Sequence, residues 1–166
     1  MTTNNSTNNS IVNPVCMYYC TTATTSVYTS HSFAITFDTA QYDNSSMIHS
    51  SGAYFVVPSV GVYKIYAQAQ YTPQVWSPLT SYFGIFIYTG SAGAQTTNIG
   101  GNYQGGTATT YSNNAVCSLS SLVNITNTTS QTISVLASSN TGSGNAVIVQ
   151  GQSPPTTYII IEKVSS

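Results

Sequence analysis

Charge is what this sequence of 166 residues has least of. Charged side chains make up 3% of it, against about 25% in ordinary globular proteins, and arginine is absent. The two lysines, Lys64 and Lys163, are too few to form the basic surface that neutralises phosphate groups or anionic lipids. The composition therefore excludes nucleic acid and anionic membrane surfaces as partners.

Long apolar runs are missing as well. No stretch of the sequence reaches the about 18 apolar residues that indicate a membrane-spanning helix. The N-terminal segment MTTNNSTNNS lacks both the basic and the apolar part of a secretory leader, so we expect a chain that is made without secretion. We expect residues 1–24 to form an extended N-terminal arm or connector, and residues 25–166 to form one domain.

The scarcity of acidic residues limits the chemistry that the chain can perform. Asp38, Asp43 and Glu162 are its only carboxylates, too few for paired-carboxylate catalysis or a calcium site, and Asp38 is expected to bond local backbone groups. No G-x-S-x-G motif is present, and the C-x3-C spacing of Cys16 and Cys20 is unusual for zinc and lacks a fourth ligand. We predict no catalytic residue, no metal and no cofactor, and hence a protein that is not an enzyme.

The three cysteines allow two interpretations. Cys117 stands in an alternating segment and is expected to be a small buried apolar residue. Because three is an odd number, a disulfide within the chain leaves one cysteine unpaired. Cys16 and Cys20 are therefore candidates for an intermolecular disulfide between the arm and a neighbouring subunit, with burial as the alternative.

What the sequence does have is the alternation of β-strands. Residues 62–71 follow turn residues at Pro58 and Gly61 and alternate with a period of two, and no segment shows a helical period. Residues 15–19 are either a short strand or an anchor on a neighbour. With about eight to ten such segments separated by turn signals, the pattern predicts an all-β sandwich or jelly roll. The apolar face of residues 62–71 consists of Tyr63, Ile65, Ala67, Ala69 and Tyr71.

Two motifs in this region resemble a known family. Ile35-Thr36-Phe37-Asp38, followed by YFVVPSVGVYKI at residues 54–65, resembles the first half of the globular head domain of the first complement component. That domain shares the tumour-necrosis-factor-like jelly roll, so the resemblance implies an antiparallel jelly-roll sandwich. The C-terminal YIIIEKV at residues 158–164 is similar to the end of related head domains on Bacillus spore-surface collagen-like proteins. The usual K-G-D between two late strands is replaced here by Asn124–Thr129.

The resemblance also implies a homotrimer, since three jelly rolls of that family pack around a threefold axis through aromatic and aliphatic strand faces. Tyrosine suits such interfaces because it combines a large apolar area with a polar tip. We predict that five aromatic residues are divided between the core and the subunit interface, although all five could instead belong to the core of one chain. These residues are Tyr63, Tyr82, Phe86, Tyr88 and Tyr158.

An uncharged surface keeps a lone protein poorly soluble, which favours either an assembly or a glycosylated coat. Our first hypothesis is a non-enzymatic structural protein on a virion surface, a capsid, decoration or spike protein whose arm docks on other coat or shell proteins. The second is a spore-surface or extracellular filament subunit. The third is a carbohydrate-binding module, in which Trp76 and tyrosine-rich loops stack on glycans. Candidate N-glycosylation sequons begin at Asn4, Asn5, Asn8, Asn44, Asn124 and Asn127.

Overall fold

The computed structural model describes most of the chain, and every structural statement below concerns those residues. Among them are twelve β-strands, and no helix has the length and apolar character needed to cross a membrane. The described residues are 13–22, 24–27, 31–73, 82–91, 94, 96–105, 115–140, 147–149 and 156–166.

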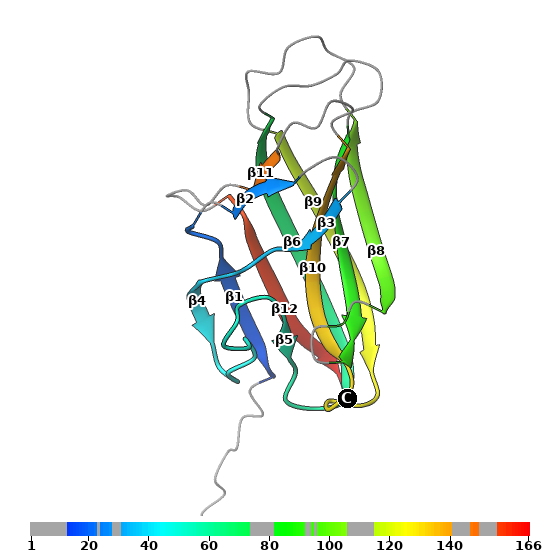
Figure 1. Cartoon of the computed structure of the whole chain (residues 1–166). Helices are drawn as coiled ribbons and strands as arrows, with labels where there is room; N and C mark the ends of the chain where they lie inside the picture. The colour runs from blue at the N-terminus through cyan, green and yellow to red at the C-terminus, as the bar shows by residue number, and fades with distance from the viewer. Residues whose placement is uncertain are drawn as a thin grey trace, which may run out of the picture.

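The strands form two antiparallel sheets that lie face to face (Figure 1). The seven-stranded sheet has the order β2 (Thr24–Val27), β11 (Val147–Val149), β6 (Gly61–Pro73), β12 (Tyr158–Ser165), β1 (Val15–Tyr19) and β4 (Thr39–Asp43), with β9 (Ala115–Ile125) paired to β6. The five-stranded sheet has the order β3 (His31–Ala34), β10 (Thr132–Asn140), β7 (Tyr82–Gly90) and β8 (Thr97–Gly105), with β5 (Phe55–Val56) paired to β10. The predicted all-β antiparallel jelly-roll sandwich is confirmed.

The core lies between the two sheets and follows from the alternation of their central strands. On β6 the predicted apolar face, from Tyr63 to Tyr71, points inward and is almost completely buried. It meets the inward side chains of β7, and the rings of Tyr71 and Phe83 stack with their centroids 4.0 Å apart. Burial of such aromatic and aliphatic surface is the main favourable contribution to folding.

Side-chain hydrogen bonds join the two sheets along one edge of the sandwich. The amide of Asn102 on β8 donates to the carbonyl oxygen of Ser118 on β9 at 2.7 Å. The hydroxyl of Ser121 on β9 donates to the carbonyl oxygen of Ile99 at 2.9 Å. An unpaired strand edge is a site of unwanted pairing, and these bonds use carbonyl groups at this edge.

Residues 15–19 form a strand of the domain. β1 pairs with β12 on one side and with β4 on the other, and Cys16 and Tyr18 enter the core. The sheet thus includes residues that we expected in an arm over residues 1–24, because their alternation supplies two buried side chains. Residues 1–12 of that predicted arm lie outside the described residues.

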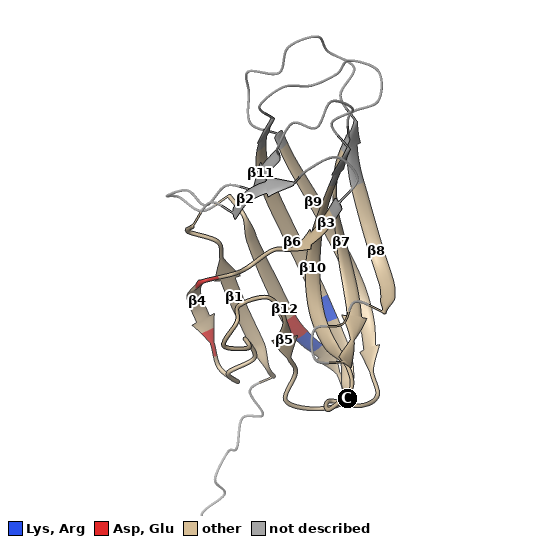
Figure 2. Ribbon diagram, viewed as in Figure 1, with Lys and Arg blue, Asp and Glu red and all other residues tan. Residues whose placement is uncertain are grey.

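The few charged residues lie in two places (Figure 2). Asp38 and Asp43 flank and end β4, at one side of the seven-stranded sheet. Lys64 on β6 stands opposite Glu162 on β12, and Lys163 follows Glu162. The rest of the described surface is built from uncharged side chains, as the composition predicts.

Candidate interaction face

The side chains of β6 that point away from the core begin a second, more exposed face. Because β-strands alternate, Lys64, Tyr66 and Gln68 lie on the side of the sheet opposite Tyr63 and Ile65. Corresponding residues of β1, β4, β9 and β12 continue this surface. We call it the outer face of the seven-stranded sheet.

An aromatic and aliphatic row crosses this outer face. The register places Met17 of β1 between Tyr42 of β4 and Ile160 of β12, and places Ile160 beside Tyr66 of β6. Tyr42 is 41% exposed, and the other three side chains are half-buried. We call these four residues the outer strip. A row of apolar side chains across four strands is a surface that a partner can cover.

A pair of tyrosines extends the outer strip toward the other end of β12. The rings of Tyr66 and Tyr158 stack with a centroid separation of 5.7 Å, and the hydroxyl of Tyr66 donates to Oε1 of Gln68. Burial of the Tyr158 side chain raises its pKa, and the hydrogen bond with Tyr66 and the charge of Tyr66 act in the same direction. Gln68 is in turn held by a bond from Nε2 to the carbonyl oxygen of Thr156. The polar tips are thus bonded locally while the rings remain available for contact.

A recess of about 320 Å³ lies on the outer face next to the strip. Tyr66 and Ile160 supply its apolar wall, Lys64 and Glu162 its two charges, and Ser120 of β9 a hydroxyl. Leu122 of β9 stands beside Lys64 in the register and is 64% exposed. The outer face therefore has both a hollow and a projecting apolar side chain.

The aromatic residues that we predicted to be divided between core and interface lie in different places, as far as the structure describes their side chains. Tyr63 is completely buried, and its hydroxyl donates to the carbonyl oxygen of Ser59 at 2.8 Å. In the predicted division of these aromatic residues between core and interface, Tyr63 therefore belongs to the core. Tyr158 is on the outer face of the seven-stranded sheet, and the side chain of Tyr82 lies outside the described residues.

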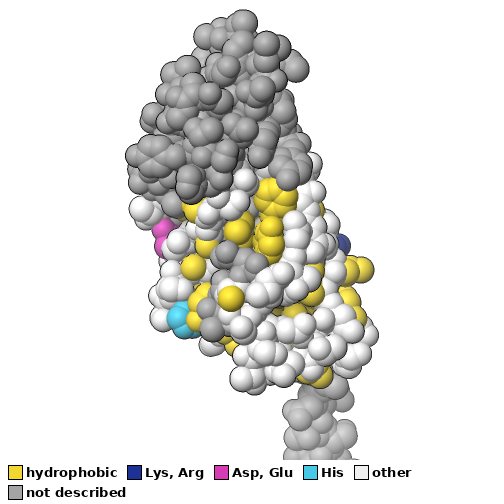
Figure 3. Space-filling view, turned by 45° about the vertical axis from the view of Figure 1, so that its right-hand side comes forward, with side chains coloured by type: hydrophobic (Ala, Val, Ile, Leu, Met, Phe, Trp, Pro, Cys, Tyr) yellow, Lys and Arg dark blue, Asp and Glu magenta, His cyan; other side chains and the backbone are white. Residues whose placement is uncertain are grey.

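Phe86 and Tyr88 lie on the outer side of the other sheet. Both alternate with the core residues of β7, and their ring centroids are 6.4 Å apart. Phe86 is 8% exposed because its ring lies over Gly101 of β8, where an added Cβ would overlap it. Figure 3 brings the β8 side of the molecule forward and shows hydrophobic side chains grouped in the middle of that face, below the grey residues. Because its ring lies against Gly101, Phe86 is itself largely covered within its own chain.

The cysteines are enclosed by their own chain. Cys16 and Cys20 are 0% and 1% exposed, and the thiol of Cys20 donates to the carbonyl oxygen of Thr22 at 2.8 Å. Burial, followed by the charge of Asp43, raises the pKa of Cys16 to about 12. All three cysteines are free thiols, and Cys117 is buried as expected. Of the two interpretations left open for Cys16 and Cys20, the structure favours burial over an intermolecular disulfide, because neither sulfur can reach a second chain without local opening.

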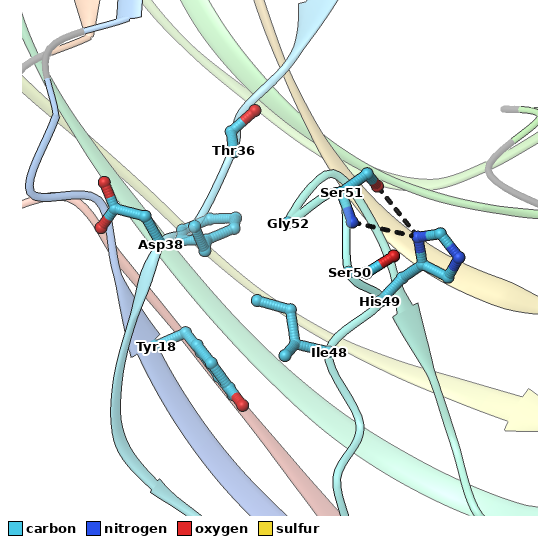
Figure 4. A pocket seen from close by; sticks show the side chains of 9 residues that line it. Tyr18, Thr36, Asp38, Ile48, His49, Ser50, Ser51 and Gly52 are labelled. Atoms are coloured by element: carbon cyan, nitrogen blue, oxygen red, sulfur yellow. Dashed lines mark hydrogen bonds between the residues drawn. The ribbon is translucent and has the colours of Figure 1, made fainter.

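A second hollow, of about 290 Å³, lies at the loops beside β4 and β5 (Figure 4). Phe37, Tyr18 and Ile48 form apolar parts of its wall, and Asp38 and His49 lie on opposite sides. The wall is completed by Thr36, Ser50, Ser51 and Gly52. Apolar walls with a few polar groups are typical of small-ligand sites.

The polar groups of this second hollow do not form a catalytic relay. The carboxylate of Asp38 accepts hydrogen bonds from the backbone amides of Thr21 and Thr22 at 2.8 and 2.9 Å. Asp38 thus bonds backbone groups as predicted, but these groups lie on a distant segment of the chain and not in its own turn. On the opposite side, Nδ1 of His49 accepts from the backbone amide of Ser51. Asp38 therefore does not orient His49, as a catalytic triad requires. Among the described residues there is also no group of three side chains suited to hold a metal ion.

The outer strip was not predicted from the sequence. Met17, Tyr42, Tyr66 and Ile160 did not appear among the predicted interface residues. The signal was available for two of them, because Tyr66 and Ile160 have the opposite phase to the buried residues of their strands. The pairing of β1 with β4 and β12, which adds Met17 and Tyr42, is a tertiary contact with no local signal.

Comparison with solved structures shows the same fold in known proteins. The Eiger TNF of S. frugiperda is similar with a TM-score of 0.62 at 13% sequence identity, covering 92% of this chain and 92% of that chain. Murine APRIL at pH 5.0 and at pH 8.0 gives TM-scores of 0.62 and 0.63 at 12% and 11% identity, covering 92% of this chain and 100% of each APRIL chain. No protein-family model matches the sequence, and no curated protein matches it.

These likenesses establish a class by fold. The chain has a TNF-like jelly-roll fold, which confirms the resemblance found in its sequence. TNF-like domains commonly form homotrimers and are typically non-enzymatic. At identities of 11–13% the likeness concerns the fold and leaves ligand and location to be argued from this chain.

Proposed function

We propose that this protein is a homotrimeric, non-enzymatic structural protein of a virion surface, whose subunits meet through the outer face of the seven-stranded sheet. The observation that supports this most directly is the outer strip, a row of aromatic and aliphatic side chains across four strands. A protein with so few charges has little electrostatic repulsion to keep such a surface from association. TNF-like domains commonly form homotrimers, which supports two further copies of this chain as the partners that cover the outer face.

The location on a particle is the part of the proposal that depends on composition. A surface of hydroxyls and amides suits a subunit whose flanks are covered by identical neighbours. We propose that the segment before β1 docks the trimer on other coat or shell proteins. Spore-surface and extracellular filament locations are the alternatives to a virion.

The first experiment measures the solution mass of the purified chain by light scattering behind a sizing column. A mass near three times 17.5 kDa is expected. A monomer would contradict the proposed assembly, and a much larger polymer would contradict a closed trimer. Sedimentation of the native source material then tests the location. The protein is expected to pellet with particles, and its recovery only in the high-speed supernatant would contradict the particle surface.

A matched pair of variants tests which face is covered. Ile160→Asp places a charge in the outer strip, and we expect at least a tenfold weaker trimer because burying an unpaired carboxylate is costly. Val56→Asp is the control, since Val56 is 38% exposed on β5 of the other sheet, and its trimer should be unchanged. Dissociation by Val56→Asp alone would move the interface to the other sheet.

Carbohydrate binding remains a second candidate because of the hollow beside β4 and β5. Its ionised Asp38, hydroxyl-bearing Ser50 and aromatic Phe37 are groups that receive hydroxyls and apolar faces of sugars. A glycan array probed with the trimer tests it. Binding that is lost in Asp38→Asn and Ser50→Ala would support this candidate, and an array without signal would remove it.

A further inference from the structure

Two of the five charged residues have no polar partner among the described residues. Asp38 accepts bonds from Thr21 and Thr22, as described above, and the ammonium group of Lys163 donates to the hydroxyl of Ser59 at 3.0 Å. Asp43 is also occupied: it accepts from the Tyr18 hydroxyl at 2.8 Å and from the Met47 amide at 2.7 Å. That leaves Lys64 and Glu162, which make no hydrogen bond or ion pair among the described residues.

These two residues without a polar partner are both on the outer face of the seven-stranded sheet. Lys64 and Glu162 face each other in the register of β6 and β12, both are exposed, and both line the recess beside the outer strip. No other Lys, Asp or Glu of the described residues lies on this face. Any partner that covers it must therefore meet one cation and one anion side by side.

A second copy of the same chain meets this requirement. In a closed ring each subunit uses one part of its surface to contact a different part of the next. A face with one positive and one negative group is self-complementary in such a contact, because the cation of one subunit can meet the anion of the next. Without that match, covering the face would remove both charges from water with no partner on the covering molecule, and the desolvation of an ion is costly.

We propose that Lys64 of each subunit pairs with Glu162 of the next subunit around the trimer, so that three ion pairs fix how the subunits are oriented. This inference rests on the proposed trimer and adds the contacts that select its geometry. The outer strip would supply contact area, which is apolar and tolerant of rotation. The ion pairs would fix the relative orientation of the subunits. In a misaligned trimer, like charges would meet, or each charge would be buried without an opposite charge from the next subunit.

The test uses two charge-reversal variants, Lys64→Glu and Glu162→Lys, of the full chain. Each alone places like charges at all three contacts, and we expect at least a tenfold weaker trimer by dilution light scattering. The double variant, which exchanges the charges, is expected to restore the trimer. Lys163→Glu is the control, because that lysine is bonded to Ser59, and its trimer should be unaffected. Circular dichroism confirms that each variant is folded.

Mixing the two single variants distinguishes pairs between subunits from pairs within one. A Lys64→Glu subunit beside a Glu162→Lys subunit has opposite charges at their contact, so a mixed trimer has two contacts of opposite charge and one of like charge, in place of three of like charge. Mixed trimers are therefore expected in native mass spectrometry, with one variant labelled with a heavy nitrogen isotope because the two variants are almost equal in mass. Absence of mixed trimers would overturn the proposal, because a pair confined to one chain cannot be rescued by another chain. Single variants that remain trimers of unchanged strength would overturn it too, and leave the trimer itself intact. A monomeric wild-type chain would overturn both proposals.

Discussion

At the scale of single residues, the two aspartates bond uncharged groups. Asp43 binds the hydroxyl of Tyr18 and the backbone amides of Ser45 and Met47, which holds the loop after β4 against β1. Asp38 binds Thr21 and Thr22 and so joins the end of β1 to the start of β4. In a chain without arginine, backbone amides and hydroxyls serve as donors, and such bonds to an ionised group are stronger than neutral ones.

Asp38 gives a prediction for the pH dependence of stability. Burial alone would raise the pKa of its carboxyl, but the hydrogen bonds from Thr21 and Thr22 lower it from 3.8 to about 2. A pKa that is lower in the folded state contributes stability above pH 4, and this contribution is lost as the pH falls toward 2. We expect Asp38→Asn to lower the free energy of unfolding by about 1 kcal/mol at pH 7, since the site is exposed to solvent.

Urea unfolding at pH 7 and at pH 2 measures this contribution. The difference between wild-type and Asp38→Asn should be present at pH 7 and nearly vanish at pH 2. A difference that is the same at both pH values would show that the carboxylate charge is not what stabilises this junction.

Gly61 gives a prediction from backbone geometry. Its φ of 141° is unfavourable for residues with a Cβ, and an added Cβ would overlap the carbonyl oxygen of Ser165. We expect Gly61→Ala to destabilise the fold by about 3 kcal/mol. Gly100→Ala is the control, because its Cβ would make ordinary contacts of 3.4 Å or more, and it should change stability by less than about 0.5 kcal/mol. Thermal melts compare the two, and equal melting temperatures would contradict the argument.

At the scale of elements, β6 has two faces with different roles. One face supplies buried residues from Tyr63 to Tyr71, and the other supplies Lys64 and Tyr66 to the outer face. Because successive side chains of a strand point to opposite sides, a shift of one residue in register would exchange these faces. The apolar residues on the inner side of β6 therefore also determine which residues of β6 lie on the outer face.

The strand β1 gives a prediction about truncation. Removing residues 1–12 leaves the strand intact, and we expect a folded protein with an unchanged melting temperature. Removing residues 1–20 deletes Cys16 and Tyr18 from the core and exposes the edge of β12, so we expect an unfolded or aggregated product. Circular dichroism and sizing chromatography of both products provide the test. A stable fold without β1 would return these residues to the arm that we first expected.

At the scale of the whole molecule, the scarcity of charge predicts an assembly that is insensitive to moderate pH. Histidine is the side chain whose charge ordinarily changes between about pH 5 and 8, and the chain has two, His31 and His49. We expect the mass in solution to stay constant from about pH 5 to 9. A trimer of the double variant His31→Gln, His49→Gln that still dissociates sharply in this range would contradict the prediction.

The sequence by itself determined the fold class and the inner face of the sandwich. Strand alternation requires neighbours two apart to share a side, so the burial of Tyr63 and Ile65 together followed from local pattern. Which of the remaining aromatic residues share a surface depended on strand order. Only the pairing of β4, β1, β12 and β6 brings Tyr42, Met17, Ile160 and Tyr66 into one row and sets Lys64 opposite Glu162. Pairing between strands distant in the chain is chosen by the energy of the whole sheet, and for that reason the residues of the outer strip were decided by tertiary structure.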